Sequence, residues 1–445
     1  MVHAAVRAGR PAGAVVGRIR QQRLDLAATP GRLWLLLIGL VTLCLAWGAL
    51  SAYTAQHYSS AASSVVNTRE QLSLDAQQIY SHLSDANDAT ATAFLAPGPE
   101  SAATRTRYTS DIAAASSGIE QVTADGGVTG TAAQDLAVLA KFLPTYTQEI
   151  GDAEANNRLG LPLGAAYLRD ASGLMRGNLL TSAKDLYAAE NASLSAASAQ
   201  ATGLPLIIVT LVVGVAVGFL LYRASRWLRG RTNRVLNVGL VAAGTLLAVS
   251  VIWLAAAFLG ARSDLLSAQA RGSATVEAVA QASITAQEAH ADESLTLIDN
   301  TGRDSYEMDF IAQSKALGPG DGTLLAGAAA AAAGTPAGPT VTTAASDATA
   351  WFADHTALRA LDDHGQHPAA VNSALGTGAK DSGAAFTRLA DDFAAAIHSD
   401  QAVFNSTAPA AASAYAGVVA ATIAAALLMA AACVWGLSRR IAEYR

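Results

Sequence analysis

Five arginines with no acidic residue among them are the sharpest chemical feature of the sequence. They lie in residues 223–234, between two long apolar runs, together with one tryptophan: Arg223, Arg226, Trp227, Arg229, Arg231 and Arg234. Guanidinium groups bind phosphates and carboxylates through paired, charge-assisted hydrogen bonds. The segment could therefore contact the headgroups of membrane lipids, which basic loops beside membrane spans favour, or an acidic partner protein.

Two other sets of side chains could bind a ligand. Four arginines in the polar segments could hold a carboxylate, although solvated helix faces explain them as well: Arg105, Arg107, Arg169 and Arg176. Residues 362–367, "DDHGQH", combine histidines and carboxylates with His355 nearby. Their spacing fits no metal-binding motif and favours a solvated helix end. Trp351 could line a pocket, but a single tryptophan in a helical segment is more typical of the core.

The sequence contains no known catalytic signature. It has no phosphate-binding glycine loop, no nucleophile elbow and no kinase motif, so we predict no enzymatic activity, no cofactor and no metal. We also predict no nucleic-acid partner. The apolar runs lack ionisable residues, which ion and proton pathways usually need, and this disfavours transport.

Four uncharged apolar runs must position these residues. They cover 33–53, 204–222, 235–259 and 414–437. A bilayer core about 30 Å thick is crossed by about 20 apolar residues in a helix, so each run predicts a transmembrane helix. The first run is longer than the roughly 7–15 apolar residues of a signal peptide, which favours a retained anchor over a cleaved leader.

The distribution of charge predicts the orientation of these spans. The segments 1–32, 223–234 and 438–445 together hold 14 basic and two acidic residues, whereas the rest of the chain holds 15 basic and 33 acidic residues. Loops rich in Lys and Arg stay in the cytoplasm. We therefore predict a multi-pass protein of a bacterial plasma membrane, with both termini and the arginine loop cytoplasmic and with segments 54–203 and 260–413 outside.

Both large polar segments are predicted to be helical. Apolar residues recur on one helical face near each end of the first segment: Val65, Leu72, Ile79 and Leu83, and then Leu168, Met175, Leu179 and Leu186. Gly- and Pro-rich breaks at 96–100, 124–130 and 158–164 divide that segment into four helices. No breaker follows the first span, so its helix should continue into the bundle. The second segment predicts four or five helices, with breaks near 299–304, 317–322 and 334–340.

The pattern of span, polar segment and span occurs twice in the same orientation. "QLSLDAQ" (71–77) resembles "QASITAQ" (281–287), and "AKDLYAA" (183–189) resembles "ADDFAAA" (390–396). The fold that we predict is an all-α integral membrane protein with four transmembrane helices and two extracytoplasmic antiparallel helical-bundle domains, arranged as a direct repeat.

Small residues and cysteines lie within the predicted spans. Gly214 and Gly218 form a small-xxx-small pair suited to close packing between transmembrane helices. The only cysteines are Cys44, near mid-membrane, and Cys433, near the cytoplasmic end, so we expect them not to pair. The composition, rich in Ala, Gly and Arg, is typical of an actinobacterium.

This layout resembles the actinobacterial GlnX-type four-span membrane sensor of the glutamate/aspartate-sensing pathway. The resemblance covers nearly the whole chain in layout and transfers no individual residues. It implies that an extracytoplasmic amino-acid-binding lipoprotein docks on the outer segments. It also implies that a soluble serine/threonine kinase is regulated inside the cell.

The sequence therefore predicts a non-enzymatic transmembrane signal transducer. No single cytoplasmic segment is large enough for a catalytic domain, so any output must be a contact with another protein. A structural role, as an envelope scaffold or a subunit of a larger membrane complex, is the alternative. A homo-oligomer is compatible with either function.

Overall fold

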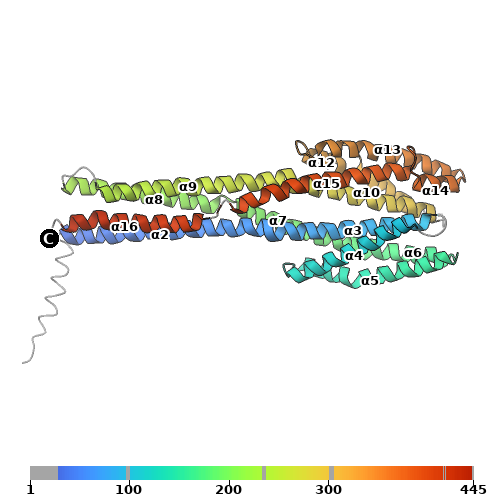
Figure 1. The fold of residues 1–445 in the computed structure, drawn as a ribbon, viewed down its shortest axis with the longest axis horizontal. Coiled ribbons are helices and arrows are strands. Elements are labelled where there is room, and N and C mark those ends of the chain that lie inside the picture. The colour runs from blue at the N-terminus through green and yellow to red at the C-terminus, as the bar shows by residue number, and fades with distance from the viewer. Residues whose placement is uncertain are drawn as a thin grey trace, which may run out of the picture. The chain divides into compact units, whose positions relative to one another are not determined.

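The computed structural model describes residues 29–96, 101–232, 237–299, 305–413, 415 and 417–442, and it is all-α over these residues. Within these residues, four helices are long and apolar enough to cross a membrane by length and composition. They include α2 (Thr29–Ser64), α8 (Pro205–Thr232), α9 (Val238–Ala268) and α16 (Val418–Ala442). Each of them overlaps one of the predicted apolar runs (Figure 1).

The chain divides into two compact units. The first, which we call the span unit, consists of the described parts of Met1–Ser60, Gly203–Ala261 and Ser413–Arg445. The second, the bundle unit, consists of Ala61–Thr202 and Arg262–Ala412. Several basic residues lie outside the part of the chain that the structure describes: residues 1–28 of the predicted tail at 1–32, Arg234, residues 443–445 and the side chains of Arg32, Arg231 and Arg440.

All four helices contribute to the apolar core of the span unit, which includes Leu37, Trp47, Leu247 and Met429. Among its polar contacts, Thr54 on α2 and Thr210 on α8 share a hydrogen bond of 2.8 Å. Such side-chain bonds satisfy polar groups that lipid cannot. The core therefore combines close apolar packing with a few paired hydroxyls.

The glycines of the span unit differ in how closely their neighbours approach. A Cβ added at Gly214 would lie 2.7 Å from Trp47 and 2.9 Å from Val251, whereas at Gly218 the nearest atom would be 3.5 Å away. Gly214 is thus needed for helix contact, while Gly218 has ordinary space. Closer approaches, which the motif did not indicate, occur at Gly48 against Ala426 and at Gly239 against Gly436.

The two cysteines are neighbours in the span unit. Cys44 on α2 and Cys433 on α16 are free and are buried in the same core cluster. The depth in the membrane that the sequence assigned to each of them stays a prediction.

The first segment of the bundle unit begins with the end of α2, which continues into a π-helical turn, η1 (Val65–Arg69). The helices α3 (Glu70–Leu95), α4 (Ala102–Asp125), α5 (Thr131–Arg158) and α6 (Leu163–Leu174) follow, and the last of these continues through η2 (Met175–Leu180) into α7 (Thr181–Thr202). The three predicted breaks are confirmed, and all eight stripe residues are buried.

Local chemistry explains these helix ends. The hydroxyl of Ser101 accepts a hydrogen bond of 3.0 Å from the backbone N–H of Thr104 and caps the start of α4. At its other end, Gly126 has a φ of 62°, a left-handed conformation in which glycine carries no Cβ penalty. A side-chain cap thus begins α4, and a left-handed glycine ends it.

The second segment begins with its own π-helical turn, η3 (Gln269–Ser273), which follows α9. It contains α10 (Ala274–Ile298), α11 (Ser305–Leu317), α12 (Leu324–Ala331), α13 (Gly338–Asp363), α14 (His367–Leu375) and α15 (Ser382–Ser413). Over the described residues, the second segment thus has six helices, one more than the upper figure of the four or five that the sequence predicted. The π-helical turns before α3 and α10 favour a direct repeat of the two segments. However, α12 and α14 have no counterpart among the described helices of the first segment. The direct repeat therefore stays a prediction.

The helices α3 and α10 pack against each other in the middle of the bundle unit (Figure 1). Helices α4 and α7 pack on α3, while α11 and α12 pack on α10. Since each member of the central pair is covered on several sides, each buries polar as well as apolar residues. This central pair positions the candidate site.

Candidate functional site

Buried charge is concentrated on the central helix pair. Asp88 on α3 and Glu293 on α10 are completely buried. His290 and Asp292, also on α10, are at most 5% exposed. A buried charge is costly unless it is paired and hydrogen-bonded. The partners of these four residues therefore determine which charged forms the α3–α10 helix pair can hold.

The first group of partners joins α3, α4 and α10. Nδ1 of His290 contacts a carboxylate oxygen of Asp88, and Nη2 of Arg107 lies 3.0 Å from the other oxygen. The same nitrogen lies 2.8 Å from Oδ1 of Asp85. We call Asp88, His290 and Arg107 the first relay.

The electrostatics of the first relay favour its charged forms. Burial alone would raise the pKa of Asp88, but His290 and Arg107 outweigh burial and hold that pKa below its ordinary range. Burial alone would lower the pKa of His290, but Asp88 beside it raises that pKa above the ordinary 6.5. The pair therefore favours an imidazolium beside a carboxylate.

The second group of partners lies entirely within the second segment. Nδ1 of His355 on α13 lies 2.7 Å from Oε2 of Glu293, and its Nε2 lies 3.3 Å from Oε1 of Glu307 on α11. Nε of Arg359 lies 3.2 Å from Oε2 of Glu307. The hydroxyl of Ser382, at the start of α15, lies 2.8 and 2.7 Å from the two oxygens of Glu293. We call Glu293, His355 and Glu307 the second relay.

The second relay also favours an imidazolium. Burial alone would lower the pKa of His355, but its hydrogen bonds to Glu293 and Glu307 raise that pKa above its ordinary value. Burial alone would raise the pKa of Glu307. The hydrogen bond and charge of His355, together with the smaller effect of the charge of Arg359, instead hold this pKa below its ordinary value. Through these contacts, one histidine connects α10, α11, α13 and α15.

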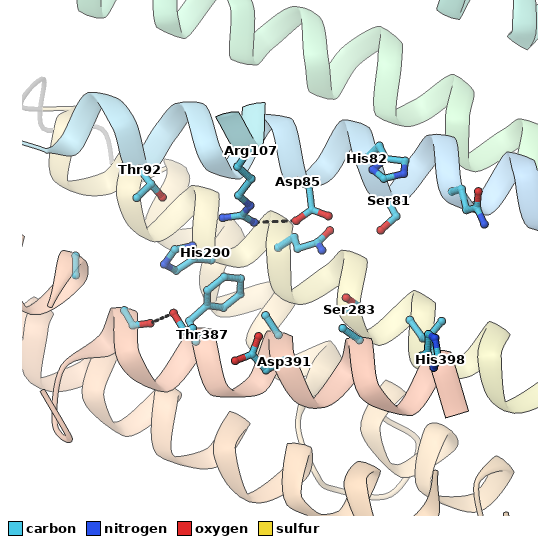
Figure 2. A pocket seen from close by; sticks show the side chains of 18 of the residues that line it. Ser81, His82, Asp85, Thr92, Arg107, Ser283, His290, Thr387, Asp391 and His398 are labelled. Atoms are coloured by element: carbon cyan, nitrogen blue, oxygen red, sulfur yellow. Dashed lines mark hydrogen bonds and ion pairs between the residues drawn. The ribbon is translucent and has the colours of Figure 1, made fainter. Parts of the chain in front are cut away.

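A large cleft opens beside the first relay. It has a volume of about 840 Å³ and lies between α3, α10 and α15, with Arg107 of α4 at its edge (Figure 2). His82, Asp85 and His290 line one side, and Asp391 and His398 line the side formed by α15. Nε2 of His290 and Oε1 of Gln287 are buried here without a hydrogen-bond partner in the protein. The cleft can therefore offer hydrogen bonds to a polar ligand or to water.

A second, smaller cleft of about 320 Å³ lies on the opposite face of the central pair. Helical periodicity separates the two clefts, since residues 283, 287 and 290 of α10 face the first and residues 288 and 292 face the second. Arg176 forms ion pairs here with Asp292 and Asp309. Burial raises the pKa of Asp292 to about 7 in spite of Arg176.

The four arginines that the sequence singled out as carboxylate-binding candidates all pair with carboxylates of the protein itself. Arg105 pairs with Glu154 at 3.1 Å and Arg169 with Asp299 at 3.9 Å. Arg107 and Arg176 each line one of the two clefts. Arg105 lines a third cleft, of about 500 Å³, between α4 and α5, so three of the four candidates lie at clefts.

The "DDHGQH" residues and His355 have different environments. Asp362 contacts Arg359 at 2.7 Å and His367 at 2.8 Å, at the turn between α13 and α14. His355 is instead buried in the second relay. Among the described residues, no group of three or more His, Cys, Asp or Glu could hold a metal ion. Trp351 is fully buried in the core of the second segment.

The arginines at the end of α8 are on its surface. Arg223, Arg226 and Arg229 are exposed and recur every third residue, so they form one row along the helix, and Trp227 is half-buried against the core of the span unit.

Sequence reasoning missed the relays. The available signal was the run "AHADESL" at 289–295, where a histidine and three charged or hydroxyl-bearing neighbours interrupt a helix otherwise rich in alanine. Polar residues at positions that a helix must bury indicate a partner helix with complementary groups.

Together, four apolar helices and a bundle with a charged interior define an all-α membrane protein. Residues 61–199 match the family model of the actinobacterial sensor domain. This match covers η1 and α3 to α7, the first segment of the bundle unit, and supports an actinobacterial sensor protein with a role in sensing and signal transduction. Neither the comparison with curated proteins nor that with solved structures found a match.

Proposed function

We propose that the protein is a non-enzymatic transmembrane signal transducer that relays an extracytoplasmic signal to a cytoplasmic partner. The observation that carries this proposal is the match to the sensor-domain model. The matched residues include α3, which is one member of the charged central pair. Helical backbone also continues from α2 through η1 into α3, which offers a mechanical connection between span and bundle helices.

The proposal requires an orientation. We propose that the segments 1–32, 223–234 and 438–445 are cytoplasmic and that both polar segments are outside a bacterial plasma membrane, since this places the basic segments inside. A reporter enzyme that is active only outside the cytoplasm should be active when fused after Asn157 and inactive when fused after Gly230. Equal activity of the two fusions contradicts the orientation.

For the signal, we propose amino-acid availability, read through a binding lipoprotein that docks on the bundle unit. The support is the resemblance in layout to the GlnX-type sensors. Affinity capture of the full chain from cells grown with and without added amino acids tests this step. We expect an extracytoplasmic binding protein whose recovery depends on the amino acids. Identical recovery in both conditions contradicts the step.

For the output, we propose that the row of Arg223, Arg226 and Arg229 contacts a cytoplasmic protein such as a serine/threonine kinase. The row is exposed, and lipid headgroups compete for the same groups. Alanine at the three positions should reduce recovery of the partner. Lysine at the same positions is the matched control, because it keeps the charge that fixes the topology but loses the planar hydrogen-bonding geometry.

These two triple variants separate the interpretations. A protein contact through guanidinium groups predicts that both variants lose the partner while the reporter fused after Gly230 stays cytoplasmic. Lipid binding or topology alone predicts that the lysine variant behaves as wild type. Unchanged recovery in the alanine variant contradicts the row as the output site.

A further inference from the structure

The two relays share a geometry that the signalling proposal does not use. In each, a carboxylate holds an imidazole nitrogen, and a phenylalanine ring covers the face of the imidazole. The ring of His290 stacks on Phe386 with centroids 3.7 Å apart and planes at 4°, and the ring of His355 stacks on Phe310 at 3.6 Å and 19°. An aromatic face attracts a cation, so this cover favours the protonated imidazole in both places.

One tryptophan connects the two stacks. The ring of Trp351 lies 5.2 Å from Phe386, 5.4 Å from Phe310 and 6.2 Å from His290, centroid to centroid. Trp351 is fully buried, so it reports on the interior and not on solvent. Any change in the charge of His290 or in the position of either phenylalanine alters its surroundings.

The charges around each imidazole come from several helices. His290 faces Asp88 of α3, Arg107 of α4 and Glu293 of α10, while α13 and α15 present the uncharged Trp351 and Phe386. The corresponding groups around His355 are Glu293 of α10, Glu307 of α11, Arg359 of α13 and, through Glu293, the hydroxyl of Ser382 on α15.

These groups leave negative charge in excess when the histidines are neutral. Arg107 is shared between Asp85 and Asp88, and Arg359 is shared between Glu307, Asp362 and Asp363. The guanidinium groups therefore cannot alone compensate Asp88 and Glu293, both of which have fully buried side chains. A buried carboxylate without a compensating cation is strongly unfavourable.

We propose that the bundle unit is a proton sensor, in which His290 and His355 bind the sensed protons and loss of these protons loosens the contacts of α10 with α3 and α13. The larger cleft provides the route for exchange at the first relay, because His290 lines it and Nε2 of that residue has no protein partner. The second relay is coupled to the first through Glu293, whose charge acts on both imidazoles.

The direction of the response follows from the geometry and from the raised pKa values of both histidines. A histidine whose pKa is higher in the folded state stabilises that state fully below the unfolded value of 6.5. This stabilisation is lost as the pH rises through the folded pKa. The compact arrangement is therefore the acid-side state, and the loosened one is the alkaline-side state.

Trp351 fluorescence of the full chain in detergent or nanodiscs tests the proposal. Between about pH 6 and about pH 9, we expect one reversible transition in emission with a midpoint above 6.5. Trp351→Phe should abolish the transition, which assigns it to this residue among the six tryptophans. His290→Gln and His355→Gln should each shift or reduce the transition, and the double variant should lose it.

His364→Gln is the matched control. His364 is exposed, on the same helix end as Asp363, and bonds to the backbone oxygen of Ala360, so its replacement should leave the transition unchanged. Far-UV circular dichroism at about pH 6 identifies any variant that fails to fold. If the double variant fails to fold, the titrations of the two single variants and of the wild type test the proposal.

The outcomes are separate from those of the signalling proposal. An emission that stays constant over the pH range, or a transition that persists unchanged in both single variants, overturns proton sensing and leaves the transducer proposal standing. Failure to capture any partner overturns the transducer proposal without affecting the Trp351 titration.

Discussion

Oε2 of Glu293 on α10 lies 2.7 Å from Nδ1 of His355 on α13, and both residues are buried. Glu293 also accepts from Ser382, so one carboxylate holds three helices of the second segment together. Glu293→Gln removes the charge but keeps the shape, and it leaves His355 with a single carboxylate partner. We expect the free energy of unfolding of the bundle to fall by about 3–5 kcal/mol, the usual cost of breaking a buried ion pair.

Chemical denaturation of the full chain, followed by tryptophan emission, measures this loss. Glu120→Gln is the matched control, because Glu120 is exposed on α4 and the same chemical change should alter stability by less than about 0.5 kcal/mol. A similar loss in both variants contradicts a structural role for the contact between Glu293 and His355.

Arg107 and Arg105 offer a comparison on one helix. Arg107 compensates the fully buried Asp88, whereas Arg105 pairs with Glu154 and has a side chain 52% exposed. Arg107→Met should therefore destabilise the bundle by several kcal/mol, since it leaves a buried carboxylate with His290 as its remaining cation. Arg105→Met should cost about 0–1 kcal/mol. Equal urea midpoints for the two variants contradict the assignment of Arg107 to the first relay.

The sequence predicted the local structure of the bundle well, for identifiable reasons. Stripe residues such as Leu72 and Met175 are buried because helical periodicity directs them to one face, and that face must pack. Breaks such as 124–130 interrupt the chain because Gly126 adopts a left-handed conformation at the end of α4. Both signals are local, and they depend on neighbouring residues alone.

The pairing of α3 with α10 could not be predicted in the same way. Asp88 and His290 are 202 residues apart, and no periodicity within either segment connects them. Each stripe accounts for one buried face, but α3 is buried on a second face as well, where its partners are polar. The relays therefore depend on a long-range contact. The same limit applies to Cys44 and Cys433, which share a core cluster because of a tertiary contact between α2 and α16.

Asp292 predicts a specific pH dependence. Burial raises its pKa to about 7 from the ordinary 3.8, so the folded state favours the protonated acid. Its contribution to stability is fully present below 3.8 and is lost as the pH rises through about 7. Asp292→Asn cannot ionise, so urea midpoints at about pH 5 and about pH 8 should differ less than in the wild type. Asp170→Asn, a change in α6 away from this cleft, is the control, and an unchanged difference in Asp292→Asn contradicts the role of its ionisation.

Gly214 and Gly218 provide the last test, in the span unit. An added methyl group at Gly214 would lie 2.7 Å from Trp47 and 2.9 Å from Val251, far inside van der Waals contact, whereas at Gly218 it would lie 3.5 Å from Leu247. Gly214→Ala should therefore force α8 away from α2 and α9 and lower the thermal unfolding temperature in detergent, with a cost of about 1–3 kcal/mol typical of overpacking. Gly218→Ala adds the same atom where there is room and should leave the temperature within error or raise it. If the two variants unfold at the same temperature, the close contact of Gly214 with Trp47 does not determine the packing of the span helices.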